Sequence, residues 1–302
     1  MKKWKTPLRY PGGKSKAMNK LFTAENLPVE HIAEYREPFL GGGSPAIAFA
    51  KMYPNTPVWV NDKYYNLYCF WKMLQEQGDK LHDVVMSMRK EYDTEEKAKE
   101  LFDRIRKDIE EQDDMFEIAW RMYIINKCSF SGLTESSSFS KRASASNWSM
   151  SNISSLLYYH ELIRDWKITN LDYSELLTND KNTFIFLDPP YDLKKDYTLA
   201  GSDGEALYGK KGNMHKGFNH VEFADKLNQH ECMMMVTYNS NENIRKLFEG
   251  WRQTEWDLTY SMNNGNVKYQ EAQKERKELL CINYKTHKTH TLEEFFLNDA
   301  RD

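Results

Sequence analysis

Four consecutive residues, Asp188-Pro189-Pro190-Tyr191, combine a carboxylate, a stiff turn and an aromatic ring. They follow Phe184 to Leu187, an apolar run without alternation that predicts a strand buried on both faces. Asp188 would then lie at the carboxyl edge of a sheet, where open α/β folds bind ligands. Because prolines fix the backbone and lack an N–H donor, the turn aims the carbonyl of Pro189 and delivers Tyr191 at a fixed offset. Two acceptors beside a flat ring suit a planar heterocycle with an exocyclic amino group.

A second group of residues suits a ligand that contains adenosine. Gly41, Gly43 and Ala46 have the GxGxxG/A spacing, between a short strand and an apolar helix that begins at Ser44. Asp62 follows about 20 residues later, at the end of a second strand, where an acid can accept both ribose hydroxyls. The spacing leaves NAD and S-adenosylmethionine open.

The N-terminal segment carries a third pattern, with Tyr10, Gly12, Gly13 and Lys14 close together. A Walker phosphate loop needs a glycine at the position of Leu8, which disfavours a nucleoside triphosphate site. What remains is a glycine turn with one aromatic ring and one cation, suited to a ligand carboxylate, or an ordinary turn.

The elements that must position these residues form two blocks. Strands and helices of an α/β sheet domain are expected in 1–75 and 165–302, with Asp172 at the carboxyl end of a strand over 166–171. Residues 76–164 read as an inserted, mainly helical domain with dense charge of both signs. Residues 192–217 are rich in glycine and lysine, and their length is typical of a functional loop over a site.

Residues 127–152, at the end of the insertion, are rich in serine and interleave basic and aromatic side chains. Such a composition is typical of a loop that reads nucleic acid, and equally of a flexible surface loop, so both interpretations remain open. The candidate nucleic-acid contacts are Lys127, Ser129, Ser131, Lys141, Arg142 and Trp148.

Composition sets the class of protein. The 302 residues are 40 % hydrophobic, which excludes a disordered chain, and no apolar run approaches the roughly 20 residues of a membrane span. A charge of −3 gives no global attraction to nucleic acid, so such contacts must be local. Four scattered cysteines without a CxxC pair predict free thiols and no metal site, and the charged start MKKWK lacks an export signal. We therefore expect a cytoplasmic protein.

Three motifs together resemble the Dam-type (D12 class) DNA adenine-N6 methyltransferases. They are Tyr10 to Lys14, Glu37 to Ser44 and Asp188 to Tyr191, and Glu278-Leu279-Leu280 looks like the family's final strand. The resemblance implies a Rossmann-like seven-stranded sheet with helices on both faces and an inserted target-recognition domain over 76–164. It also implies that double-stranded DNA is the partner and S-adenosylmethionine the cofactor. The recognition region looks more like phage and restriction-system relatives, so no recognition sequence is transferred, and a restriction endonuclease counterpart is expected.

The resemblance also implies roles for individual residues. Tyr10 and Lys14 would contact the methionine end of the cofactor, Asp62 its ribose and Asp172 its adenine. The full set of cofactor-binding residues is Tyr10, Lys14, Pro38, Phe39, Gly41, Gly43, Ser44, Asp62, Asp172 and Asp188. The catalytic set is Asp188, Pro189, Pro190 and Tyr191.

A mechanism follows from the chemistry of adenine. Its amino nitrogen is a poor nucleophile and cannot reach a cofactor from inside a duplex, so the base is expected to flip into the pocket. Asp188 and the Pro189 carbonyl would accept the two N6 protons, while the Tyr191 ring, rather than its hydroxyl, would stack on the base. A nicotinamide dehydrogenase, a methyltransferase for RNA or protein glutamine, and a silent DNA-binding relative remain alternatives.

Overall fold

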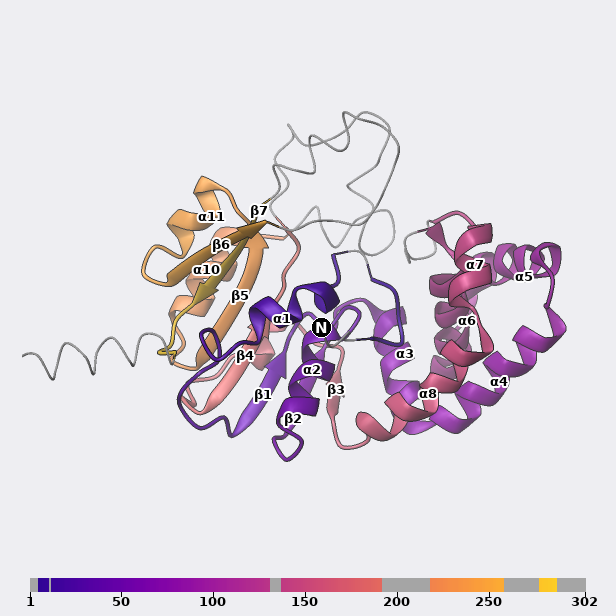
Figure 1. The fold of residues 1–302 in the computed structure, drawn as a ribbon, viewed down its shortest axis with the longest axis horizontal. Coiled ribbons are helices and arrows are strands. Elements are labelled where there is room, and N and C mark those ends of the chain that lie inside the picture. The colour runs from indigo at the N-terminus through magenta and orange to yellow at the C-terminus, as the bar shows by residue number, and fades with distance from the viewer. Residues whose placement is uncertain (1–4, 11, 131–136, 192–217, 258–276, 287–302) are drawn as a thin grey trace, which may run out of the picture.

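A seven-stranded sheet forms the centre of the protein (Figure 1). The computed structural model describes residues 5–10, 12–130, 137–191, 218–257 and 277–286. The sheet has the order β3-β2-β1-β4-β5-β7-β6, and β7 runs antiparallel to both of its neighbours. The strands are β1 Glu34–Glu37, β2 Val58–Asn61, β3 Lys167–Thr169, β4 Thr183–Leu187, β5 Met233–Asn239, β6 Arg252–Asp257 and β7 Lys277–Ile282. The predicted Rossmann-like methyltransferase sheet is confirmed.

The sheet is buried on both faces, as the lack of alternation in β4 predicted. Phe184 and Phe186 of β4 belong to one hydrophobic cluster, while Ile185 and Leu187 belong to the other. Since side chains alternate along a strand, the two clusters lie on opposite faces. Helices cover both faces. The first cluster includes residues of α1 Met18–Leu21, α2 Ser44–Met52 and α3 Tyr65–Glu76, and the second includes residues of α10 His220–Asn228 and α11 Glu242–Leu247.

The strand order changes direction between β1 and β4. From β1 the chain proceeds outward through β2 and β3, then returns to place β4 on the other side of β1. In open α/β sheets, ligands bind outside the carboxyl ends of the strands at such a switch point. The residues that follow β1 and β4 are therefore the ones best placed for chemistry.

The insertion is a group of helices beside the β3 edge of the sheet (Figure 1). Its elements are α4 Gly78–Glu91, α5 Glu95–Asp108, η2 Ile109–Glu111, α6 Met115–Cys128, α7 Lys141–Asn147 and α8 Met150–Leu162. The first hydrophobic cluster continues from the sheet into these helices without a break. Gln75, near the end of α3, ties the two ends of the insertion together, because its Nε2 donates to the carbonyls of Ile163 at 2.8 Å and Trp166 at 2.6 Å. The domain limits stay a prediction.

The serine-rich stretch is more ordered than the sequence predicted. Instead of one loop over 127–152, the described part ends α6, forms α7 and begins α8. Two of the serines are helix caps: Ser140 Oγ accepts from the amide of Ala143, and Ser149 Oγ accepts from the amide of Asn152. The loop prediction is wrong there because serine favours helix N-caps as well as loops.

Some predictions fall outside the described residues. These are the loop over 192–217 and Ser131. Two short helices complete the description, η1 Lys14–Lys16 and η4 Tyr173–Leu176. Within the described ranges, no helix is both long and apolar enough to cross a membrane.

Candidate active site

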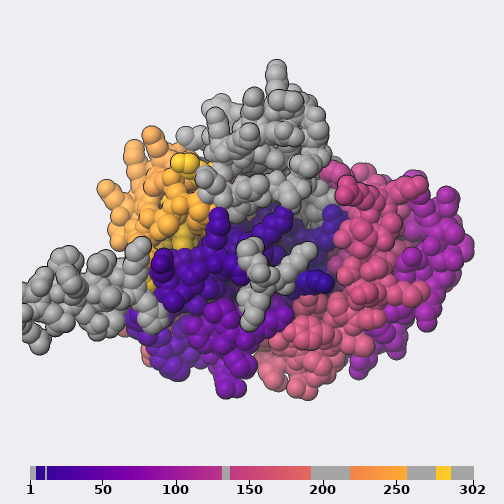
Figure 2. Space-filling view, in the orientation of Figure 1, coloured from indigo at the N-terminus to yellow at the C-terminus, as the bar shows by residue number. Residues whose placement is uncertain are grey.

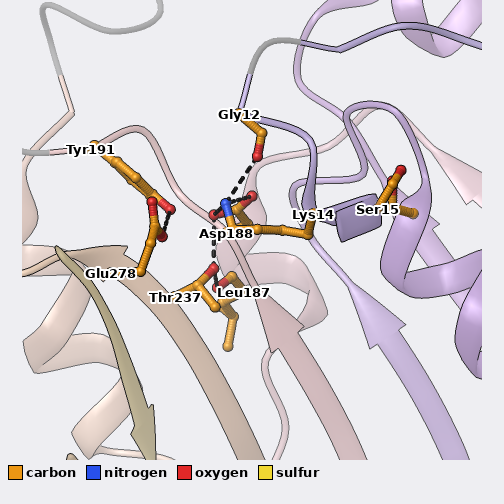
Figure 3. A network of polar contacts seen from close by, with 9 residues as sticks. Gly12, Lys14, Ser15, Leu187, Asp188, Tyr191, Thr237 and Glu278 are labelled. Carbon is orange, nitrogen blue, oxygen red and sulfur yellow. Dashed lines mark hydrogen bonds and ion pairs between the residues drawn. The ribbon is translucent and has the colours of Figure 1, made fainter. Parts of the chain in front are cut away.

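Asp188 lies at the carboxyl edge of the sheet, directly after the fully buried strand β4. Its neighbours come from two other elements. Lys14 Nζ lies 2.7 Å from both Oδ1 and Oδ2 of Asp188, and Thr237 Oγ1, on β5, donates to Oδ1 at 2.8 Å (Figure 3). The carboxylate is thus fixed at two points, although residues 14, 188 and 237 are far apart in the sequence.

Lys14 lies deep in the site, with 4 % of its side chain exposed. Besides Asp188, its ammonium donates to the Gly12 carbonyl at 3.2 Å and lies 5.0 Å from the centre of the Tyr191 ring. The chain brings it there because Gly12, with φ of 72°, turns the backbone ahead of η1. A buried cation needs such partners to offset its lost hydration. Its expected contact with a cofactor carboxylate stays a prediction.

Tyr191 follows the two prolines and is half-buried. Its hydroxyl donates to Oε2 of Glu278, on β7, and its ring lies 6.0 Å from the ring of Tyr238 at an interplanar angle of 35°. One face of the ring is therefore close to the Lys14 ammonium and to Asp188 (Figure 3). The structure brings Asp188 and Tyr191 together as the sequence predicted.

The glycine turn lies after β1, beside the N-terminal segment. Gly41 and Gly43 have φ of 51° and 72°, in the left-handed region that favours glycine. A Cβ at Gly41 would approach the Tyr10 ring to 2.9 Å, so this turn leaves no room for a side chain. Ser44, the first residue of α2, shares a hydrogen bond of 2.7 Å with Ser15, which joins the two candidate cofactor segments.

Asp62 follows β2 and is tied to the glycine turn. Its Oδ2 accepts from the amide of Gly41 at 2.8 Å, and its Oδ1 accepts from the amide of Tyr64 at 2.9 Å. Burial raises the pKa of Asp62 to about 6, against the effect of these two hydrogen bonds. Each carboxylate oxygen has a second lone pair, so the group retains acceptor capacity for a diol.

Phe39 and Asp172 form the other end of the site. The Phe39 ring stacks on Tyr173, with ring centres 5.6 Å apart and 26° between the planes. Asp172 is exposed and caps η4. Burial alone would raise its pKa, but hydrogen bonds from Ser174 and the charges of Lys63 and Lys226 lower it. An aromatic face beside an ionised acid suits a ring with an exocyclic amino group.

Three residues that sequence reasoning missed complete the site. Glu37, the last residue of β1, is 1 % exposed and accepts a hydrogen bond from the Tyr35 hydroxyl at 2.7 Å. Burial raises the pKa of Glu37 well above its usual range, against the hydrogen bond from Tyr35, and the charge of Asp188 adds to the rise. Glu37 could have been identified from the sequence, because an acidic residue directly before the glycine turn is a candidate site residue. Thr237 and Glu278 gave none, because their partners lie 49 and 87 residues away in the sequence.

The candidate DNA contacts fall into two groups. Lys127, Ser129 and Trp148 are buried, and burial lowers the pKa of Lys127 to about 7, with the charge of Arg9 adding to the effect. Lys141 and Arg142 are exposed at the start of α7, where Lys141 contacts Glu95 at 2.5 Å. As DNA contacts, all five stay predictions.

Over the described ranges, no group of three or more His, Cys, Asp or Glu side chains could hold a metal.

Figure 2 shows the N-terminal segment, in indigo, at the centre of one face, between the C-terminal strands and the inserted helices. Asn126 of α6 holds this segment. It donates from Nδ2 to the Arg9 carbonyl at 2.6 Å and accepts from the Arg9 amide at 2.9 Å. The Arg9 side chain donates to the Ser129 carbonyl at 2.9 Å. The segment that supplies Lys14 is therefore fastened to the insertion as well as to the sheet.

Comparisons with known proteins agree with this geometry. A sequence model of the D12 class N6 adenine-specific DNA methyltransferases matches residues 10–262, which include every candidate catalytic and cofactor-binding residue. The chain is 26 % identical to the Type II methyltransferase M.MjaIII of Methanocaldococcus jannaschii over 262 residues, 81 % of this chain and 88 % of that protein. It is 21 % identical to the Type II methyltransferase M.CviBI of Paramecium bursaria Chlorella virus NC1A over 274 residues, 86 % of this chain and 93 % of that protein.

Proposed function

The chain belongs to the D12 class of N6 adenine-specific DNA methyltransferases, and from that premise we propose which residues hold the cofactor and the target base. The class accounts for the chemistry that the site suggests, transfer of a methyl group to the N6 amino group of an adenine in DNA. Because the chain belongs to this class, we no longer consider a nicotinamide dehydrogenase, or a methyltransferase for RNA or protein, as alternative functions. The observation that carries the proposal is the Asp188 carboxylate, held beside Tyr191 at the switch point of the sheet.

The cofactor that fits this site is S-adenosylmethionine, which supplies an electrophilic methyl group when bound. Three chemically distinct parts of the site support this proposal. Asp62 offers carboxylate oxygens to a ribose diol, the stacked Phe39 and Tyr173 beside Asp172 offer an environment for adenine, and Lys14 offers a cation for the methionine carboxylate. The backbone of Gly41 and Gly43 carries no side chain that would block approach. Pro38, Ser44 and Tyr10 shape the same turn.

The target amino group would take the place that the Lys14 ammonium occupies. That ammonium lies 2.7 Å from the Asp188 oxygens and 5.0 Å from the Tyr191 ring centre, which are the contacts an adenine amino group and ring would need. Lys14 would therefore exchange Asp188 for the cofactor carboxylate before the base enters. After this exchange the cofactor carboxylate would compensate the charge of Lys14, and Asp188 would accept hydrogen bonds from the neutral amino group and from Thr237.

Asp188 and the Pro189 carbonyl would then accept the two N6 protons. Such acceptors favour a tetrahedral amino nitrogen whose lone pair is free to attack, and the Asp188 charge stabilises positive charge that develops on that nitrogen. Tyr191 stacks on the flipped base and aligns it. Alignment and electrostatic stabilisation together are enough to account for the acceleration.

The DNA would lie across the insertion and the edge of the sheet. We assign phosphate contact to the exposed pair Lys141 and Arg142, and a supporting role to the buried Lys127, Ser129 and Trp148. Residues 76–164 would read the sequence. The Type II names of the two relatives support a restriction endonuclease counterpart for this chain, and the DNA substrate supports a cytoplasmic location.

The test is to incubate the purified chain with S-adenosylmethionine carrying a labelled methyl group and with unmethylated plasmid DNA, total RNA or a protein extract. We expect label in DNA alone, as N6-methyladenine, and sequencing of modified adenines then gives the recognition site. Label in RNA or protein, or none with this donor, would contradict the proposal. Asp188→Ala, folded by circular dichroism, is the matched control and should transfer no methyl group.

A further inference from the structure

We propose that Glu278 is a positioning residue for base stacking, acting through the hydroxyl of Tyr191. This inference rests on the proposed function of the site and adds a residue to it. The sequence alone gave the Tyr191 hydroxyl no role, because stacking needs only the ring. The structure gives that hydroxyl a buried acceptor, the carboxyl group of Glu278.

The first step is the location of Glu278. It lies near the start of β7, paired with Asn239 of β5 on one side and Trp256 of β6 on the other. Only 3 % of it is exposed. Glutamate is rarely buried to this degree unless its charge has hydrogen-bond partners. Its Oε2 accepts a hydrogen bond from the Tyr191 hydroxyl, and breaking this bond would leave a buried polar group without that partner.

The second step is the position of Tyr191 itself. It leaves the sheet after Pro189 and Pro190, so no strand pairing fixes its backbone. A tyrosine ring attached only at Cβ can rotate about two torsions, and its plane is then poorly defined. The prolines restrict the near end of the side chain and Glu278 holds the far end (Figure 3). Tethering both ends fixes the plane of the ring.

The third step is the consequence for the base. The tethered ring faces the Lys14 ammonium, which occupies the place proposed for the target amino group beside Asp188. A stacking face is useful only when it is parallel to the base that enters, and misalignment of reacting groups lowers the rate strongly. Glu278 would thus act on the geometry of the reaction without touching substrate or cofactor.

The experiment compares Tyr191→Phe, Glu278→Leu and Glu278→Gln with the parent, at saturating S-adenosylmethionine and saturating DNA that contains the mapped site. Losing the hydrogen bond between Tyr191 and Glu278 should lower kcat roughly tenfold or more in Tyr191→Phe and Glu278→Leu. Glu278→Gln keeps a carbonyl acceptor for the hydroxyl and should retain most of kcat. The double variant Tyr191→Phe/Glu278→Leu should be no slower than the slower single variant, because both remove the same contact.

Tyr238→Phe is the matched control. It also removes a hydroxyl from a ring beside Tyr191, but that hydroxyl bonds to His220 at 2.9 Å. We expect its kcat to stay near the parent value. A second readout uses 2-aminopurine at the target position, whose fluorescence should be quenched by the stacked ring in the parent complex and brighter in Tyr191→Phe and Glu278→Leu.

Two results would overturn the inference. One is an unchanged kcat and unchanged 2-aminopurine fluorescence in folded Tyr191→Phe, even with a lower melting temperature, since the contact would then be only structural. The other is a double variant as slow as the product of the single effects, which would mean that hydroxyl and carboxylate act separately. If Glu278→Leu fails to fold, the kcat values of Tyr191→Phe and Glu278→Gln still test whether the hydrogen bond matters for catalysis. A parent enzyme that methylates no adenine would refute the proposed function, which is a different outcome.

Discussion

Replacing Thr237 with valine is the most direct test of how Asp188 is held. Thr237 is fully buried, and its Oγ1 donates to Asp188 Oδ1 at 2.8 Å. Valine has nearly the same shape, so the change leaves no cavity. It removes the hydrogen bond to Asp188 and a longer contact, of 3.5 Å, with the Leu187 carbonyl. In the free enzyme Lys14 keeps both of its contacts with Asp188. Since Lys14 is proposed to release Asp188 when the cofactor binds, the carboxylate would then lack both anchors.

The magnitude follows from the kind of bond that is lost. A hydrogen bond to a charged group contributes about 1.5–3 kcal/mol. Because Lys14 is proposed to release the carboxylate once the cofactor binds, we expect the whole of that range to apply, or roughly a 10- to 100-fold fall in kcat/KM. The measured quantities are methyl transfer to DNA with the mapped site and the dissociation constant of S-adenosylmethionine, which should change little. Thr237→Ser, which keeps the hydroxyl, should recover most of the lost activity.

The reasoning would be refuted by a folded Thr237→Val enzyme that works at the parent rate. It would also be refuted if Thr237→Ser were as slow as Thr237→Val, because the methyl group and not the hydroxyl would then be responsible. A melting curve for each variant separates these results from a general loss of stability.

Three further predictions concern other parts of the site. The pKa of Asp62 is raised to about 6 in the folded state from an ordinary value of 3.8, so its protonated form is favoured by folding, and the parent should lose about 3 kcal/mol of stability as pH rises from about 4 to about 6. In Asp62→Asn the free energy of unfolding, measured by urea denaturation at each pH, should not fall over this range. The same fall with pH in both proteins would contradict a raised pKa for Asp62. Lys141→Ala should weaken binding to all DNA sequences and reduce the slope of log K against log salt by about one, whereas loss at a single base position would make it a base reader. Asp188→Ala should abolish methyl transfer while its calorimetric affinity for S-adenosylmethionine stays within a modest factor, and near-parent activity would remove the centre of the mechanism.

Local sequence was enough to predict the framework of the site. The apolar run before Asp188 specified a doubly buried strand, and the left-handed Gly41 and Gly43 were recognisable because their spacing lies within one strand, turn and helix. Asp62 could be placed at the next strand end for the same reason. These features depend on contacts between near neighbours or on the periodicity of a single element.

The pairings across the sheet could not be predicted in this way. Thr237 and Glu278 reach the site only because β5 lies beside β4, and β7 lies beside β5, in the folded sheet. The position of Lys14 against Asp188 likewise depends on how the N-terminal turn packs. The serine-rich stretch was misread because the serines Ser140 and Ser149 cap helices, and composition does not distinguish a cap from a loop.

The hydrogen bonds of Gln75 have a consequence for replacing the inserted residues 76–164 with another segment. They hold the entry and exit of a segment of almost 90 residues at one point, so a replacement segment with the same spacing between its ends could be accommodated without moving β3 or α3. The shared core of α3 and α6 adds a condition, because a replacement must present a matching apolar face to α3. Exchange of the inserted segment between related genes should therefore succeed when the helix that packs on α3 is exchanged together with the surface it contacts, and fail when the crossover separates the two.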